Sequence, residues 1–178
     1  MIKKIAVFTF IFCVSYSGFT QTKNTNFSKE ALIKAAKEII NSTGTCALIT
    51  QDKNGISRVR TMDPFPPEEN LTIWFGTNPI SRKVAQIKNN NNVTIYYRDK
   101  DDSGYVTIHG KATLVNNQKD KNNYWKETWK SFYPNKKDSY LLIKVEPIWM
   151  EIVSPPRKII GNDKTWEPPI VFFRGLTN

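Results

Sequence analysis

Hydrophobic and polar positions alternate with two different periods along this chain. After an apolar run at residues 5–14, apolar residues recur every three to four positions between 28 and 41, which predicts a one-sided helix capped by Ser28. From Thr45 onward the period is two, in short runs divided by Gly, Pro, Asn and Asp, a pattern typical of strands and turns. The predicted strands are residues 45–50, 56–62, 71–77, 93–98, 105–115, 140–146 and 148–153.

The segment 105–115 shows the strand pattern most clearly. Val106 and Ile108 fall on one face with other small or apolar residues, and the residues between them are mostly polar, which predicts a strand with one buried face. The segments 52–55 and 101–104 end in glycine and have the composition of hairpin turns. We therefore expect an antiparallel meander.

Three helical segments interrupt the strands, at residues 28–41, 79–88 and 118–132. A parallel α/β sheet needs more helices than this, whereas six or seven short antiparallel strands favour a closed or nearly closed barrel, because closure removes exposed edges. The proline-rich stretch from Pro155 is expected to wrap over the barrel as a loop and an edge strand. The sequence predicts a single mainly β domain with peripheral helices, spanning residues 22–178.

Residues 1–21 have the order of a secretory signal peptide, with Lys3 and Lys4 before the apolar run and small or polar residues after it. The apolar run has ten residues, whereas a membrane-spanning helix needs about 20, so we expect no membrane anchor. We expect the signal to be cleaved and the domain to be exported, as a periplasmic or secreted protein. Cleavage removes Cys13 and leaves Cys46 as a buried, inert thiol.

Composition narrows the functional classes. The 178 residues are 39% hydrophobic and 12% aromatic, which suits one globular domain and excludes wholesale disorder. One histidine and one cysteine after cleavage cannot supply a zinc site. The formal net charge is +10, or +8 once Lys3 and Lys4 are removed with the signal, which suits a nucleic-acid partner, but export argues against one. The sequence has no Walker motif, no dinucleotide-binding fingerprint and no Gly-x-Ser-x-Gly hydrolase motif.

The helix expected at 79–88 begins with good start signals. Asn78 suits the N-cap and Pro79 suits the first helical position. The apolar face that anchors this helix is then Ile80, Val84 and Ile87.

Ser81, Arg82 and Lys83 occupy the first turn of this helix. Two cations there oppose the positive end of the helix dipole, which costs about 0.3–1 kcal/mol each when exposed, and a bound anion reverses the sign. Backbone N–H groups, a hydroxyl and two cations together make a phosphate site. The alternative is a solvated basic turn.

The preceding strand, 56–62, supports a ligand site nearby. Alternation places Arg58, Arg60 and Met62 on one face. Two arginines beside a thioether suit the wall of a ligand site, and a surface stripe is the alternative.

Taken in order, these segments resemble a known family. They are Arg-Val-Arg-Thr-Met at 58–62, Leu-Thr-Ile-Trp-Phe-Gly-Thr at 71–77, Ser-Arg-Lys-Val-Ala-Gln-Ile at 81–87, Val-Thr-Ile-Tyr-Tyr at 93–97 and Tyr-Val-Thr-Ile-His-Gly-Lys-Ala at 105–112. Their order resembles the pyridoxamine 5'-phosphate oxidase-like FMN-binding split barrels, and within them the general stress protein branch, over about residues 28–153.

The resemblance implies a six- to seven-stranded antiparallel split barrel that forms a homodimer, with FMN in clefts between the two barrels. The residues that it implies for FMN are Ser81, Arg82 and Lys83 at the phosphate, Arg60, Thr61 and Met62 along the flavin and ribityl chain, and Phe75 and Thr77 beside them.

Because a flavin carries out redox chemistry itself, the resemblance implies an FMN-dependent oxidoreductase with no catalytic side chain to name, acting on an unidentified small molecule. The sequence lacks the C-terminal Arg and His pattern by which true pyridoxamine phosphate oxidases hold their substrate, so that activity is not expected. Two alternatives stay open. One is a non-catalytic secreted binding module for anionic ligands, and the other is the same barrel carrying haem or deazaflavin.

Three further features of the sequence are candidates for a role in ligand binding. The aromatic residues of 118–132 form a stripe, as a lid or dimer contact or as a surface for ligand stacking. His109 lies on the polar face of its strand, as a hydrogen-bonded or surface histidine or as a haem ligand. Trp166 is a candidate to close the pocket by stacking.

Overall fold

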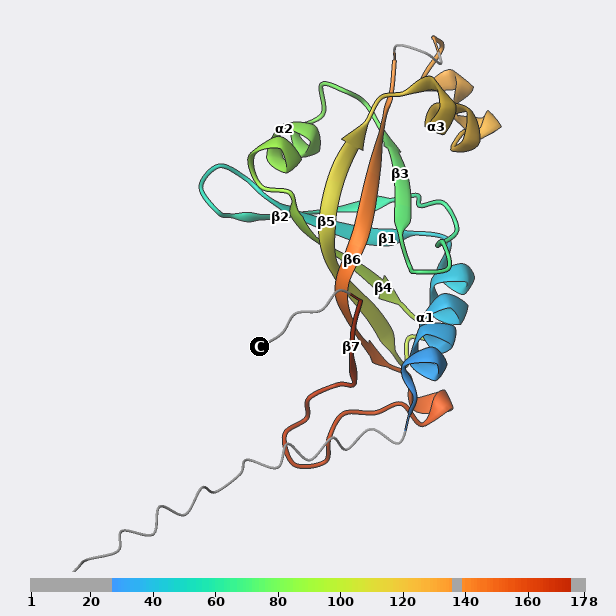
Figure 1. Ribbon diagram of the computed structural model, residues 1–178, viewed down its shortest axis with the longest axis vertical. Helices are drawn as coiled ribbons and strands as arrows, with labels where there is room; N and C mark the ends of the chain where they lie inside the picture. The colour runs from blue at the N-terminus through green and yellow to red at the C-terminus, as the bar shows by residue number, and fades with distance from the viewer. Residues whose placement is uncertain (1–26, 136–138, 174–178) are drawn as a thin grey trace, which may run out of the picture.

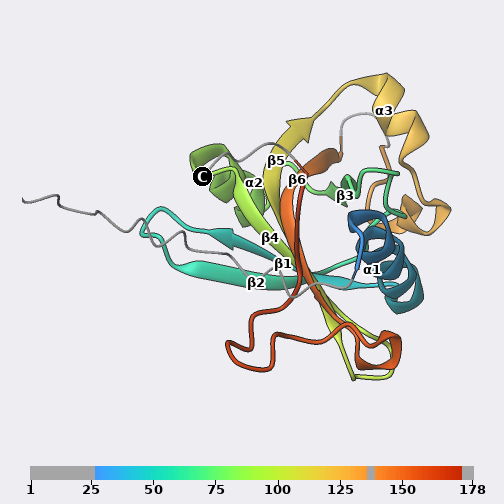
Figure 2. The same ribbon diagram turned by 60° about the horizontal axis from the view of Figure 1, so that its bottom comes forward.

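The computed structural model describes residues 27–135 and 139–173, so the signal peptide expected at 1–21 lies outside the described residues. Within that range the chain forms one seven-stranded sheet with three α-helices around it (Figures 1 and 2). The strands are β1 (Cys46–Gln51), β2 (Ser57–Met62), β3 (Ile73–Thr77), β4 (Asn92–Arg98), β5 (Tyr105–Val115), β6 (Leu141–Val153) and β7 (Ile170–Phe172). The helices are α1 (Lys29–Thr43), α2 (Arg82–Asn89) and α3 (Gln118–Asn123), with 3-10 turns η1 (Glu127–Ser131) and η2 (Pro155–Arg157).

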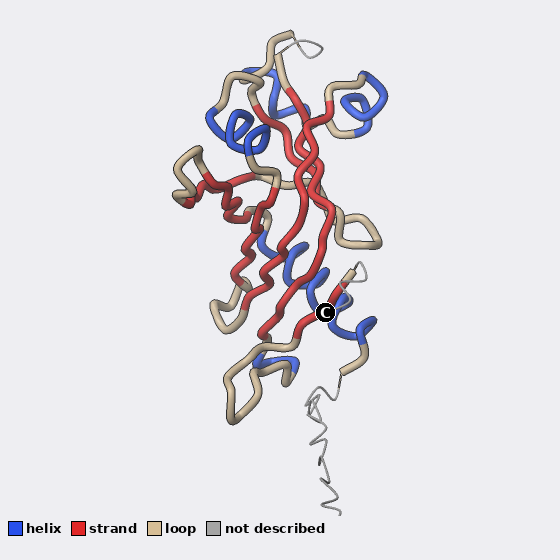
Figure 3. Tube along the Cα trace, turned by 60° about the vertical axis from the view of Figure 1, so that its left-hand side comes forward, coloured by secondary structure: helices blue, strands red, loops and turns tan. Residues whose placement is uncertain are grey.

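The sheet is antiparallel throughout and strongly twisted (Figure 3). Its strand order is β2-β1-β4-β5-β6-β3. Strand β7 lies outside this order and pairs with residues 149–151 of β6, whereas β3 pairs with residues 141–145. The meander expectation is therefore wrong for β3, which pairs with β6 and not with β2, the strand before it in the sequence. Since β2 and β3 are not paired with each other, the sheet stays open, as in a split barrel, and is not a closed one.

The two strands expected at 140–146 and 148–153 are one strand, β6, with Pro147 in its middle. Pro147 lies opposite Gly110, where the register between β5 and β6 shifts. A Cβ at Gly110 would lie 2.5 Å from the carbonyl oxygen of Glu146, so only glycine fits this close approach. A proline is tolerated at such an irregularity because the ladder is already interrupted there.

Helix α1 covers one side of the sheet, where it contacts β4, β5 and β7 (Figure 1). Its N-cap is Ser28, whose hydroxyl accepts a hydrogen bond from the Ala31 amide at 3.2 Å, as the sequence predicts. The helix ends at Gly44, which has a φ of 71°. Its buried face is Leu32, Ala35, Ala36, Ile39 and Ile40.

The continuous helix expected at 118–132 is wrong, because the chain breaks between α3 and η1. Two tertiary contacts account for the break. Tyr124 stacks on Trp74 with ring centroids 4.3 Å apart, and Lys126 forms an ion pair with Asp63 at 2.5 Å. These contacts hold the segment against β3 and the loop after β2 at the expense of regular helix.

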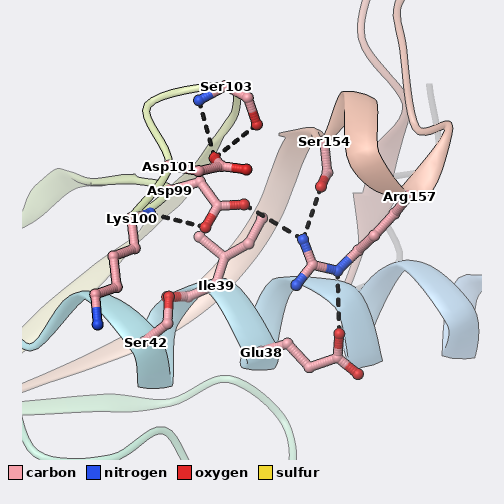
Figure 4. A network of polar contacts seen from close by, with 9 residues as sticks. All are labelled: Glu38, Ile39, Ser42, Asp99, Lys100, Asp101, Ser103, Ser154 and Arg157. Carbon is pink, nitrogen blue, oxygen red and sulfur yellow. Dashed lines mark hydrogen bonds and ion pairs between the residues drawn. The ribbon is translucent and has the colours of Figure 1, made fainter.

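Arg157, in η2, links the C-terminal part to two other parts of the chain (Figure 4). Arg157 donates from Nε to Glu38 of α1 at 3.0 Å, and from Nη1 to Ser154 at 2.9 Å and Asp99 at 3.3 Å. Asp99 lies in the β4–β5 turn, so a single guanidinium joins the helix, the hairpin and the chain after β6. The expected edge strand is confirmed as β7.

Among the described residues, no helix has the length and apolar character to cross a membrane.

Candidate functional site

The turn before α2 differs from the expected helix start. Ser81, with extended φ and ψ of −68° and 145°, is the N-cap, so α2 begins at Arg82. Asn78 instead shapes a preceding turn, since its side chain accepts from the Ile80 amide and its carbonyl accepts from the Ser81 amide, both at 3.0 Å. Ile80 is consequently 92% exposed and does not belong to the buried face, which Val84 and Ile87 form.

Three polar side chains meet at this turn. The hydroxyl of Thr77, at the end of β3, lies 3.0 Å from the Ser81 hydroxyl and accepts a hydrogen bond from Lys83 Nζ, also at 3.0 Å. Thr77 is buried and Lys83 is half-buried. Burial, and then the charge of Arg60, lower the pKa of Lys83, so these surroundings disfavour its ammonium form.

Arg60 reaches the same place from β2. Its Nη1 donates to Thr50 Oγ1 at 2.7 Å and to the Leu48 carbonyl at 3.2 Å, and its Nη2 donates to Gln86 Oε1 of α2 at 2.9 Å. These partners are all uncharged. Burial, and then the charge of Arg82, lower the pKa of Arg60.

Arg60 lies close enough to both Arg82 and Lys83 for their like charges to repel, so the three form a cluster of cations. None of the three takes part in an ion pair within residues 27–135 and 139–173. Like charges held together without a carboxylate cost free energy, and an anion at this helix N-terminus would remove that cost. The arrangement is thus chemically suited to a phosphate or another anion.

The structure separates Arg58 from Arg60, although alternation places both on one face of β2. Arg58 donates from Nε and Nη2 to Asp52 Oδ2 at 2.9 and 2.7 Å, across the β1–β2 hairpin. Arg58 thus stabilises the β1–β2 hairpin at the surface. Of these two arginines, only Arg60 belongs to the cation cluster.

A cleft of about 550 Å³ lies beside the cation cluster. It brings together four of the residues that the resemblance implies for FMN, namely Thr61, Met62, Thr77 and Lys83. Ser81 adjoins the cleft through Thr77. The full lining is Thr61, Met62, Asp63, Gly76, Thr77, Asn78, Lys83, Thr128, Trp129, Phe132 and Tyr133.

Phe75 does not line the cleft. Its ring is completely buried in the main hydrophobic core, two residues deeper along β3 than Thr77. Both faces of β3 are covered, so alternation alone does not separate its core positions from its cleft positions.

Sequence reasoning missed the cleft residues of the segment 128–133. The aromatic stripe in 118–132 was the available signal, but the lid and the ligand-stacking interpretations were both open. The structure shows that Trp129 packs directly on β3, since a Cβ at Gly76 would lie 2.4 Å from its ring. Trp129, Phe132 and Tyr133 also line the cleft, so the segment is at once a cover of the barrel and a wall of the site.

His109 and Trp166 lie outside this cleft. The His109 ring stacks on Trp149 with centroids 3.7 Å apart, and its Nδ1 lies 3.0 Å from the Thr94 hydroxyl. Burial lowers the pKa of His109. Trp166 is 85% exposed in the loop that connects η2 to β7, which lies at the opposite end of the molecule from α3 (Figure 1).

Cys46 is buried, and burial raises the pKa of its thiol to about 12, in agreement with the inert thiol expected from the sequence. Within the described part of the chain, no group of three or more His, Cys, Asp or Glu side chains is arranged to hold a metal ion.

Comparison with solved structures supports the fold. The chain is similar to general stress protein 26 from Bacillus anthracis strain Sterne, with 24% identity, a TM-score of 0.64, and 79% of this chain and 98% of that one covered. It is also similar to a protein related to general stress protein 26 from Clostridium acetobutylicum, with 20% identity, a TM-score of 0.63 and coverage of 70% and 89%. A pyridoxamine 5'-phosphate oxidase-related, FMN-binding protein from Nostoc punctiforme gives 15% identity, a TM-score of 0.57 and coverage of 80% and 93%.

A search of curated proteins gave no match. The sequence itself matches the family model described as pyridoxamine 5'-phosphate oxidase like, over residues 32–151. That span contains the whole open sheet except β7 and the end of β6, together with the cation cluster and the cleft. The chain therefore belongs to the pyridoxamine 5'-phosphate oxidase-like family.

Proposed function

We propose that this protein binds FMN in the cleft and acts as a flavin-dependent oxidoreductase. The observation that carries the proposal is the cation cluster, in which Arg60, Arg82 and Lys83 converge without a carboxylate partner in the described chain. The second pKa of a phosphate monoester is about 6, so the group carries up to two negative charges near neutral pH, which suits such a cluster at a helix N-terminus. The similarity to a protein described as FMN-binding supports the choice of ligand.

The residues present fit FMN. Ser81, Arg82 and Lys83 would hold the phosphate, with Arg60 reaching in from β2. Thr61 and Met62 follow Arg60 along β2 and line the cleft, where they would contact the ribityl chain and the flavin ring. A volume of about 550 Å³ is in the range of small-molecule sites. When bound, the flavin supplies the redox chemistry, and this chain binds and orients it.

We also propose that two copies of the chain form the complete site. The outer face of the sheet carries a row of side chains that runs across six strands, and no helix or strand of the described residues covers it. In register order the row is Val59, Ile49, Thr94, His109, Trp149 and Phe172. Val59 is 66% exposed and Phe172 is 49% exposed, so the row presents a largely apolar surface for a second copy.

Thr61 connects this face to the cleft. It pairs with Ala47 in the next row of the same outer face, and it also lines the cleft. A second copy on the outer face would therefore border the cleft and help to enclose the flavin. The apolar leader at residues 5–14 supports the further proposal that the protein is exported after signal cleavage.

The test is FMN binding by purified protein. We expect a yellow protein, or FMN uptake seen as quenching of flavin fluorescence, and a Lys83→Ala variant that binds FMN about ten- to hundredfold more weakly, because a charged hydrogen bond is worth about 1.5–3 kcal/mol. Lys88→Ala is the matched control, since Lys88 is an exposed lysine in the last turn of the same helix.

A colourless protein that does not bind added FMN would overturn the proposal. If it then binds inorganic phosphate through Lys83, the anion-binding module becomes the better function. If it instead takes up haem or deazaflavin, the barrel carries another planar cofactor.

A further inference from the structure

The segment 124–133 contributes a wall of aromatic rings to the cleft. Trp129 lies so close to β3 that Gly76 has no room for a side chain. Phe132 is 76% exposed and lines the same cleft, as does the half-buried Tyr133. A large apolar side chain that stays exposed at the edge of a cleft is a feature of ligand sites.

The neighbours of Trp129 hold its ring in place. Phe65, Trp125 and Tyr133 contact it edge-on, with centroids 5.5–6.0 Å away and interplanar angles of 72–85°. Lys126 lies over the rings of Phe65 and Trp129 at 5.1 and 5.8 Å. A ring fixed on several sides loses little conformational entropy when a ligand stacks nearby, so this wall is preorganised for binding.

The charge of the cleft selects against cationic ligands. Asp63 is the one acid among the lining residues, and it is ion-paired with Lys126 at 2.5 Å. Lys126 also donates to the Pro64 carbonyl at 2.9 Å, which fixes the pair. With Lys83 in the lining and Arg60 and Arg82 nearby, the cleft favours neutral or anionic ligands.

We propose that Trp129, Phe132 and Tyr133 bind the second reactant of the site, and that this reactant is a planar aromatic molecule that is neutral or anionic. The inference rests on the proposed function, in which FMN occupies the cation cluster and the stretch Thr61–Met62. The second reactant then lies between the flavin and the aromatic wall. The three residues determine ring specificity and take no part in the chemistry.

Two probes of equal charge and similar size test this wall. They are 2-naphthoate, which is planar and aromatic, and decahydronaphthalene-2-carboxylate, which is its saturated counterpart. Isothermal titration calorimetry of the FMN-loaded protein should show tighter binding of 2-naphthoate by about tenfold, because aromatic pairs are worth about 0.5–1.5 kcal/mol beyond buried area. Phe132→Leu should lower this preference about threefold or more and leave FMN affinity unchanged.

Phe132→Leu is the main variant because the side chain is exposed, so its replacement does not disturb the core. Trp166→Leu is the matched control, since Trp166 is an exposed aromatic residue outside the cleft and should leave the preference intact. Equal binding of the two probes, or a preference that Phe132→Leu does not change, would overturn the inference.

Two other outcomes separate this inference from the function on which it rests. Displacement of FMN by 2-naphthoate, or a loss of FMN affinity in Phe132→Leu, would show that the wall holds the flavin ring itself and would overturn the inference while keeping the flavin function. A colourless protein that ignores FMN but still prefers 2-naphthoate in a Phe132-dependent way would overturn the flavin function and support the wall as an aromatic site.

Discussion

At the residue scale, the site depends on which cations have an acidic partner. Arg58 and Arg60 are two residues apart on one strand face, yet Arg58 pairs with Asp52, whereas the acceptors of Arg60 among the described residues are all neutral. This ion pair stabilises the hairpin, and the carboxylate of Asp52 neutralises the charge of Arg58. The charge of Arg60 is not neutralised by an ion pair in the described chain, and after burial it is the second cause that lowers the pKa of Lys83.

This lowered pKa predicts how FMN binding depends on pH. A phosphate in the site favours the charged ammonium of Lys83, so FMN affinity should be constant while this lysine is charged and should fall as pH rises through its lowered pKa. The fall should begin below about pH 10.4, the ordinary lysine pKa. Fluorescence titrations of FMN between about pH 7 and pH 10.4 measure it, because the phosphate is a dianion throughout that range.

The control for this pH profile is Lys83→Arg, which keeps the charge and titrates only at much higher pH. Its FMN affinity should stay level over the same range. A decline of equal slope in both proteins would contradict the assignment to Lys83.

At the scale of elements, Gly76 determines how the aromatic segment meets the sheet. The indole of Trp129 occupies the space that any side chain at position 76 would need, at 2.4 Å from an added Cβ. Trp129 therefore docks on the strand next to Thr77, and the segment becomes part of the cleft.

Gly76→Ala should lower the free energy of unfolding by about 1–3 kcal/mol, as overpacking does in a filled core. The clash is with one ring, so in a Trp129→Leu background the same change should cost much less, which a double-mutant cycle from urea denaturation measures. Equal costs in the two backgrounds would mean that the backbone of β3, and not the indole, resists the substitution.

At the scale of the whole molecule, none of the described helices covers the outer face of the open sheet. Helix α1 and the main core occupy the inner side, whereas Val59, Tyr96 and Phe172 are exposed on the outer side. Because Thr61 belongs both to this face and to the cleft, dimer formation and FMN binding should be linked.

Val59→Asp should convert the proposed dimer to a monomer in sedimentation-velocity experiments, because a carboxylate buried without a partner at an interface is strongly unfavourable. It should also weaken FMN binding. Ile160→Asp is the control, since Ile160 is similarly exposed, at 61%, but lies in the loop after η2. A Val59→Asp protein that keeps the mass of the parent would contradict the proposed interface.

The local pattern of the sequence predicted the elements where one face is buried and the other is wet. It identified α1 with its Ser28 cap, the strand β5 and the basic first turn of α2, because periodicity records directly which residues avoid water. It also identified Cys46 as an inert buried thiol. For the same reason the prediction that Ile80 lies on the buried face of the helix was wrong, because this apolar side chain is exposed in a turn that Asn78 shapes.

Only the tertiary structure decided which strands pair, which residues of β3 face the cleft, and what lies over Gly76. A strand pattern gives the buried face but not the partner, so the move of β3 from β2 to β6 and the continuity of β6 through Pro147 depend on contacts between distant residues. The break after α3 likewise follows from the stacking of Tyr124 and the ion pair of Lys126. By itself the sequence determined the elements and the cations at the start of α2, whereas long-range packing determined the cleft beside them, because packing alone brings β2, β3 and the aromatic segment together.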